Sequence, residues 1–153
     1  MYGTVEGADT YHEARANAAW TGSNDAKAAA LLRASDWIDG AYGPRFVGTP
    51  VGDAEWPRSG AVDSRGVTLP DDEVPTRVEN ATYEAALREL TSPGSLAPDF
   101  VAAAAVKREK VDVVEVEYSG AFTAADARPV VGVVEHWLAP LLAGRGFPAF
   151  LVV

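Results

Sequence analysis

The residues of this sequence that could do acid–base chemistry are two histidines, each directly beside a glutamate. His12 precedes Glu13, and His136 follows Glu135. Adjacent residues on a helix point in different directions, so neither pair is arranged as a general acid and base. We therefore interpret both histidines as residues on helix surfaces or in the seams between helices.

A run of three acids, Asp71-Asp72-Glu73, has the ligand type that hard cations prefer. A calcium loop needs oxygen ligands at alternating positions around a glycine, and this run lacks that spacing. Acidic residues also stabilise the first turn of a helix, which is our interpretation of the run. The sequence contains none of the common phosphate-loop, metallopeptidase or nucleophile-elbow motifs. We expect no enzymatic activity, no cofactor and no metal.

Composition limits the partners that this chain can bind. The 153 residues are 48% hydrophobic, contain no cysteine and carry a net charge of −9, as expected for one folded domain. No apolar run approaches the roughly 20 residues of a membrane span, and the first residues lack the regions of a signal peptide, so we expect a cytoplasmic origin and no membrane partner. The one basic cluster, Lys107, Arg108 and Lys110, is interrupted by Glu109. Tight nucleic-acid binding by an isolated subunit is therefore not expected.

Helical spacing of apolar residues predicts a mainly α fold, a bundle of about four helices. The expected helices cover about residues 5–19, residues 24 to between 40 and 43, residues 72 or 74 to about 90, and residues 129–142. Pro140 should kink or fray the last of them. The apolar face expected for this last helix consists of Val130, Val133, Val134, Trp137, Leu138 and Leu141.

A small β-hairpin is predicted at about residues 106–118. The segment from 110 to 118 alternates, with Val114, Val116 and Tyr118 on one side and Glu115 and Glu117 on the other. The preceding residues, with sequence VKREKV, can form the partner strand, and the turn would lie near residues 112–113.

A long stretch from about residue 45 to residue 70 connects the second and third helices. Trp56 followed by Pro57 is typical of an aromatic anchor in a rigid extended segment, so we expect an ordered but irregular loop packed on the helices.

The order of these segments resembles a family of tailed-phage and prophage proteins described as DnaT-like single-stranded-DNA-binding proteins. The resemblance covers roughly residues 3–142. It is carried by YHEARANAAW, ASDWIDGAYG, WPRSG, LPDDEVPTRVENATYEAAL and VKREKVDVVEVEY in that order. Two features depart from the family pattern: Asp112 stands where a glycine is expected in the hairpin turn, and the final segment GRGFPAFLVV is variable.

The resemblance implies a head–tail connector, or adaptor, of a phage or gene transfer agent. Such a protein forms a ring of about a dozen copies beneath the portal, around the channel through which the genome passes. The implied partners are the portal protein, neighbouring copies and the next neck or tail protein, a stopper or tail terminator. Genomic DNA would pass without sequence-specific contact. The protein would be assembled in the host cytoplasm and reside in the neck of the virion.

The hairpin is the first expected contact between subunits. Its basic residues would meet acidic groups of a neighbouring copy or of the next ring, and the alternative is a solvated basic turn. The residues of this predicted contact are Lys107, Arg108, Lys110, Val114, Val116 and Tyr118.

The second expected contact is a C-terminal arm, residues 145–153, that follows a helical domain of residues 1–144. In the adaptors that this chain resembles, the arm reaches into the portal, and Gly144 and Gly146 would act as its hinge. The alternative is a segment folded back on its own domain. The predicted binding residues are Arg145, Phe147, Pro148, Phe150, Leu151, Val152 and Val153.

A second function class stays open, that of a single-stranded-DNA-binding accessory protein. Such binding uses a positive groove with stacking aromatic residues, which an acidic chain with one interrupted basic cluster does not offer. A salt-dependent shift with single-stranded DNA would favour this class, and rings or cofractionation with a portal would favour the connector.

Overall fold

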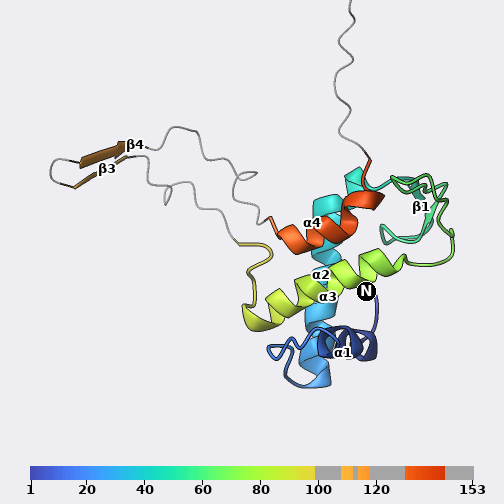
Figure 1. The fold of residues 1–153 in the computed structure, drawn as a ribbon, viewed down its shortest axis with the longest axis horizontal. Coiled ribbons are helices and arrows are strands. Elements are labelled where there is room, and N and C mark those ends of the chain that lie inside the picture. Colours follow the sequence, from blue (N-terminus) through green and yellow to red (C-terminus); the bar gives the residue numbers. More distant parts are fainter. Residues whose placement is uncertain (99–107, 112–113, 118–129, 144–153) are drawn as a thin grey trace, which may run out of the picture.

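The computed structural model describes residues 1–98, 108–111, 114–117 and 130–143. It is mainly α-helical, which confirms the predicted fold class (Figure 1). The helices are α1 (Val5–Glu13), α2 (Asn24–Tyr42), α3 (Thr76–Thr91) and α4 (Gly132–Leu138), with the 3-10 turns η1 (Gly43–Arg45) and η3 (Ala139–Leu141). The strands are β1 (Thr49–Pro50), β2 (Arg58–Ser59), β3 (Arg108–Val111) and β4 (Val114–Glu117).

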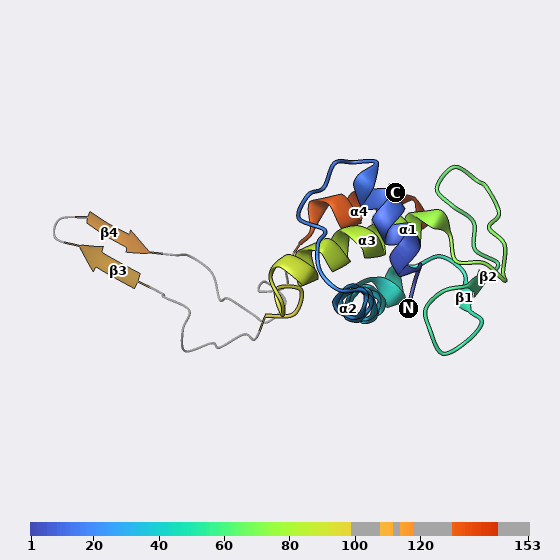
Figure 2. The same ribbon diagram turned by 90° about the horizontal axis from the view of Figure 1, so that it is seen from below.

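Helix α3 is the centre of the helical body. It packs across α2 and against α4, and α1 contacts both α2 and α3 (Figures 1 and 2). Side chains from three helices fill the space between them, and the fully buried ones include Leu31, Ile38, Val78, Val134 and Leu138. Removal of this apolar surface from water is the main force that holds the helices together.

Local signals place the starts of α2 and α3 close to their predicted positions. The Ser23 side chain caps α2 by accepting a hydrogen bond from the backbone N–H of Ala26. Pro75 stands immediately before α3 and caps it in an extended conformation. The acids Asp71, Asp72 and Glu73 therefore precede the helix, and the prediction that they occupy its first turn is wrong.

Helix α1 ends six residues before its predicted end at residue 19, because the residues that follow it make a tertiary contact instead of continuing the helix. After Glu13 the backbone turns back, with Ala16 in the left-handed region at φ 52°. This turn brings the Trp20 ring to 4.6 Å from the His12 ring, and the Trp20 indole N–H donates to Asp9. Burial of a tryptophan outweighs the helix preference of a few alanines.

Helix α4 is shorter than predicted, and its buried face is narrower. The 3-10 turn η3, which contains Pro140, continues it, as expected for a proline in the last turn. Val130 and Val133 were predicted to be part of the apolar face, but they are 72% and 43% exposed. The buried residues of this segment are Val131, Val134, Leu138 and Leu141, with Trp137 and Leu142 partly buried beside them.

The predicted hairpin is confirmed as an antiparallel pair, β3 with β4. Its register pairs Arg108 with Glu117, Glu109 with Val116, Lys110 with Glu115 and Val111 with Val114. Residues 107, 112, 113 and 118 of the predicted hairpin lie outside the described residues.

The long connection between α2 and α3 is ordered by buried contacts. Strands β1 and β2 pair briefly, and the two loops beside them lie at one end of the body (Figure 2). Trp56 is only 2% exposed, and its ring packs edge-to-face against the Phe46 ring. Its backbone N–H donates a hydrogen bond to the Tyr2 hydroxyl. Pro57 follows it through a cis peptide bond.

We expect Trp56→Ala to lower the free energy of unfolding by about 3 kcal/mol or more, because it leaves a large cavity beside Phe46. Thermal or urea unfolding of the purified chain measures this effect. Val51→Ala, which changes a residue 59% exposed in the same connection, is the control and should change stability by less than about 0.5 kcal/mol. An unchanged melt for Trp56→Ala would show that the ring does not hold the connection to the helices.

His12 is buried, and its neighbours fix which of its ring nitrogens carries the proton. Its Nε2 lies 3.1 Å from the Tyr83 carbonyl oxygen, which can only accept, so Nε2 carries the proton. Its Nδ1 then accepts from the Asn17 amide at 3.0 Å. Burial lowers the pKa of His12 below its ordinary value of 6.5, because the charged imidazolium loses water that the site does not replace.

The lowered pKa of His12 predicts a loss of stability in mild acid. Between the folded-state pKa and 6.5 the unfolded chain binds the proton more tightly, so stability falls as pH falls through this window, by up to about 1.4 kcal/mol per pH unit. Urea unfolding at a series of pH values from neutral to mildly acidic measures the slope. His12→Gln should flatten it, whereas Val51→Ala, an exposed change that removes no titratable group, should leave it unchanged. An equal slope in wild type and His12→Gln would contradict the assignment.

Candidate functional site

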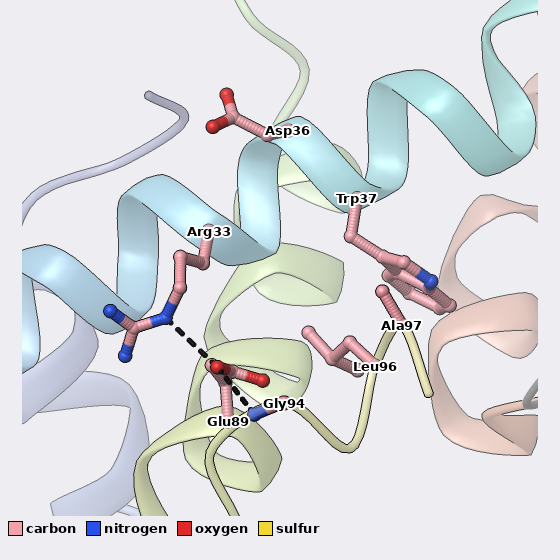
Figure 3. Close-up of a pocket in the computed structure, with 7 residues that line it drawn as sticks. All are labelled: Arg33, Asp36, Trp37, Glu89, Gly94, Leu96 and Ala97. Atoms are coloured by element: carbon pink, nitrogen blue, oxygen red, sulfur yellow. Dashed lines mark hydrogen bonds and ion pairs between the residues drawn. The ribbon is translucent and has the colours of Figure 1, made fainter. Parts of the chain in front are cut away.

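A shallow pocket of about 360 Å³ lies between α2, the end of α3 and the loop that follows α3 (Figure 3). Its walls combine an apolar side, made by Trp37 and Leu96, with charged side chains at the rim and floor. The lining residues are Arg33, Asp36, Trp37, Glu89, Gly94, Leu96 and Ala97.

Glu89 forms the floor of this pocket and holds its shape. Its side chain is 4% exposed and accepts hydrogen bonds from Arg33 Nε at 2.8 Å and from the Gly94 backbone N–H at 2.9 Å. Gly94 has a φ of +83°, in the left-handed region that favours glycine, so this residue lets the chain turn sharply after α3. The Glu89 carboxylate therefore holds both the Arg33 side chain and the loop that contains Gly94.

The charges of the pocket are poorly suited to a phosphate. Arg33 already pairs with Glu89, and Asp36 stands one helical turn away on the same rim (Figure 3). Two carboxylates against one guanidinium repel an anion, although Trp37 offers an aromatic surface of the kind on which bases stack. The pocket is better suited to an apolar or weakly basic group than to a nucleotide.

The helical body as a whole has few cations available for a polyanion. Residues 1–98 and 130–143 contain 16 Asp or Glu and 8 Lys or Arg. Four of the cations pair with carboxylates, in Lys27–Asp9, Arg33–Glu89, Arg58–Glu55 and Arg65–Asp63. Arg15, Arg45 and Arg77 lie over the rings of Tyr11, Tyr42 and Trp137. With twice as many acids as bases, and with most of its cations beside a carboxylate or an aromatic ring, this part of the chain shows no concentration of basic residues of the kind that binds phosphates.

The loops beside β1 and β2 form an acidic end of the body. Asp53, Asp71, Asp72 and Glu73 are all exposed there. In the described part of the chain no group of three or more His, Asp or Glu side chains is close enough to hold a metal ion. The exposed acids give this end of the body a negative surface field.

The hairpin carries its charges in a different arrangement, with a basic strand beside an acidic one. Strand β3 contributes Arg108 and Lys110, and strand β4 contributes Glu117 and Glu115 at the opposite register positions. Among the described elements, β3 and β4 contact only each other (Figures 1 and 2). Each basic residue of β3 therefore stands at a register position opposite a glutamate of β4, which the sequence analysis did not anticipate.

The predicted site residues are not brought together in one place. Arg108 and Lys110 are on β3, Val114 and Val116 are on β4, and Trp56 and Pro57 are in the connection between β1 and β2. Lys107 and Tyr118, and the whole predicted arm with Arg145, Phe147, Pro148, Phe150, Leu151, Val152 and Val153, lie outside the described residues.

Sequence reasoning missed two features that the structure assembles. The first is the pocket of Arg33, Trp37 and Glu89, for which the only sequence signal was a tryptophan at the edge of an apolar helix face. The second is Arg58, whose buried guanidinium donates to several carbonyl oxygens of the connection. The pocket depends on a contact between segments 56 residues apart, whereas the Arg58 acceptors lie 3, 10 and 11 residues away, in a connection whose path no local pattern encodes.

A comparison with protein families gives one match, over residues 1–153, to the family described as "Putative DnaT-like ssDNA binding protein". The chain belongs to this DnaT-like family. Comparisons with curated proteins and with solved structures find no match. The family resemblance seen in the sequence is thus confirmed, whereas the printed description names single-stranded DNA and says nothing of a virion or a connector.

The described part of this DnaT-like chain has no helix long and apolar enough to cross a membrane. The candidate surfaces described above are the Trp37 pocket, the acidic loop end and the hairpin.

Proposed function

We propose that this DnaT-like protein is a structural subunit of a phage or gene-transfer-agent neck, a head–tail connector that forms a ring beneath the portal. The observation that carries the proposal is the hairpin, whose strands contact no other described element. A two-stranded hairpin alone is marginally stable in water, so such an element is best explained by a partner molecule. Neighbouring copies in a ring supply that partner.

The surface charge of the body supports a role around DNA rather than a role that grips it. A channel through which a genome moves must not bind the phosphates tightly, because strong ion pairing would retard passage. The excess of acids over bases in residues 1–98 and 130–143 meets that requirement. Contact with genomic DNA would then be transient and independent of sequence.

The C-terminal segment supplies the proposed link to the head. Residues 147–153 have the sequence FPAFLVV, which contains no ionisable side chain. An extended apolar segment of this kind binds by adding a strand to a sheet edge or by filling an apolar groove. The portal protein and an adjacent subunit are the proposed acceptors.

Single-stranded-DNA binding is the second candidate, and the printed family description favours it. The residues that would serve it are the basic positions 107, 108 and 110 and the aromatic Tyr118 beside the hairpin. The register weakens this candidate, because Arg108 and Lys110 each stand opposite a glutamate.

Removal of residues 145–153 should leave the folded body intact but prevent the protein from joining heads. The expected result is a melting temperature equal to that of the full chain, with loss of the protein from particles that band with the portal in a density gradient. Val130→Ser, an exposed change on α4 outside the arm, is the control and should still enter particles. Normal incorporation of the truncated chain would contradict the role of the arm.

A titration of fluorescent single-stranded DNA with the full chain decides between the two candidates. The connector predicts weak binding with little dependence on salt, because few phosphates are neutralised. The accessory protein would instead be favoured by tight binding that falls steeply with salt. That binding should be lost when the charges of Lys107, Arg108 and Lys110 are all reversed.

A further inference from the structure

The pocket between α2 and the loop after α3 contains a buried carboxylate oxygen that faces its interior. The Glu89 side chain is 4% exposed, and its Oε1 accepts the hydrogen bonds from Arg33 Nε and from the Gly94 backbone N–H. In Figure 3 the other oxygen, Oε2, is turned away from these two donors, toward Leu96. No residue in the described part of the chain donates to Oε2. A buried acceptor of this kind is stabilised when a ligand brings a donor.

The apolar walls beside this oxygen are already in place. Trp37 lies one turn after Arg33 on α2, so both side chains project toward the loop (Figure 3). The Trp37 ring packs edge-to-face on the buried ring of Tyr42, with 5.7 Å between the ring centroids. Leu96 is 3% exposed. The pocket therefore offers a preformed apolar surface that ends at a carboxylate oxygen, which suits an aliphatic stem with a donor at its tip.

The charges of the pocket select a cationic donor. The guanidinium of Arg33 and the carboxylates of Asp36 and Glu89 leave the pocket with one unit of negative charge. A monocation neutralises that charge, and the aromatic face of Trp37 adds to its attraction. A hydrogen bond from a charged donor to a carboxylate is also about twice as strong as one between neutral groups.

The acceptor geometry favours an ammonium over a guanidinium. A guanidinium binds a carboxylate most strongly as a fork on both oxygens, but Oε1 of Glu89 is already occupied by Arg33 and Gly94. An ammonium is a compact point charge that needs only one oxygen. Lysine carries its ammonium at the end of an aliphatic stem, and such stems pack along apolar surface.

A lysine held by another protein suits this place better than a free amine. The pocket is shallow, and its volume of about 360 Å³ is at the low end of the range for sites that enclose small molecules. Leu32, which is 49% exposed, lies one turn before Asp36 on α2. A polypeptide can cover Leu32 while its lysine fills the pocket, whereas a free amine leaves Leu32 in water. The excess of acids in residues 1–98 and 130–143 also attracts a basic partner.

We propose that this pocket binds a lysine side chain of a basic partner protein. The ammonium donates to Oε2 of Glu89 in the field of Asp36, and the stem lies along Trp37 and Leu96. The residues of this site belong neither to the hairpin nor to the C-terminal arm. The proposal therefore goes beyond the connector function and stands without it.

Nuclear magnetic resonance of the full chain tests the site with single side chains as probes. The four tryptophans give separate indole N–H resonances, and Trp37→Phe identifies the one from Trp37 by its loss. N-acetyl-lysine amide should shift this resonance with a dissociation constant of about 1 mM. N-acetyl-norleucine amide keeps the stem without the ammonium, so it should bind about tenfold more weakly. Equal binding of norleucine amide, or tighter binding of N-acetyl-arginine amide, would overturn the assignment to lysine.

Matched variants locate the binding within the pocket. Glu89→Gln keeps one oxygen for Arg33 and Gly94 but sets an amide NH₂ where Oε2 stood, so N-acetyl-lysine amide should bind about tenfold more weakly or worse. Asp36→Asn changes an exposed side chain and should weaken binding about two- to fivefold. Asp25→Asn removes the same charge from the first turn of α2 and should have no effect.

Urea unfolding of each variant checks that it is folded. Because Asp36→Asn alters only an exposed position, it keeps the test decisive if Glu89→Gln does not fold. A folded Glu89→Gln chain that binds the lysine amide like the wild type would overturn the site. Equal affinities of Asp36→Asn and Asp25→Asn would overturn it too, because they would show attraction by the acidic body as a whole.

Discussion

The buried guanidinium of Arg58 is the contact on which the order of the α2–α3 connection depends. Arg58 is 5% exposed and donates to the carbonyl oxygens of Val47, Gly48 and Glu55 and to the Glu55 carboxylate. Without this cation, carbonyl groups of a chain with little regular structure would be buried unsatisfied, at a cost of a few kcal/mol. Because the connection leads directly into α3, and α3 packs against α2 and α4, the geometry of the body follows from it.

We expect the contacts of the proposed connector with other molecules to be made by the parts of the chain outside this helical body. Most cations of the helical region are engaged with carboxylates or aromatic rings, so its surface presents mainly acids. The hairpin, in contrast, pairs a strand that contains Arg108 and Lys110 with a strand that contains Glu115 and Glu117. This division fits the proposed connector, whose body would present acids to passing DNA. It does not suit a groove that grips single-stranded DNA, even though the family description names that activity.

Sequence reasoning succeeded where the signal was local, and it failed where packing between segments determined the structure. The cap at Ser23 and the alternation from Val114 to Glu117 were readable, because each depends on a few neighbouring residues. The early end of α1 was not, because it follows from Trp20 packing on His12. Exposure of Val133 on α4 was likewise unpredictable, since the periodicity of a helix does not reveal how much of its apolar face finds a partner. The pocket above Glu89 required the loop after α3 to return to α2, which no local pattern encodes.

Electron cryo-microscopy of the purified full chain, assembled with its portal protein, tests the central claim most directly. The account predicts a closed ring on the portal, with the acidic bodies around an open channel. Subunits that leave the portal free and instead coat added single-stranded DNA would contradict it.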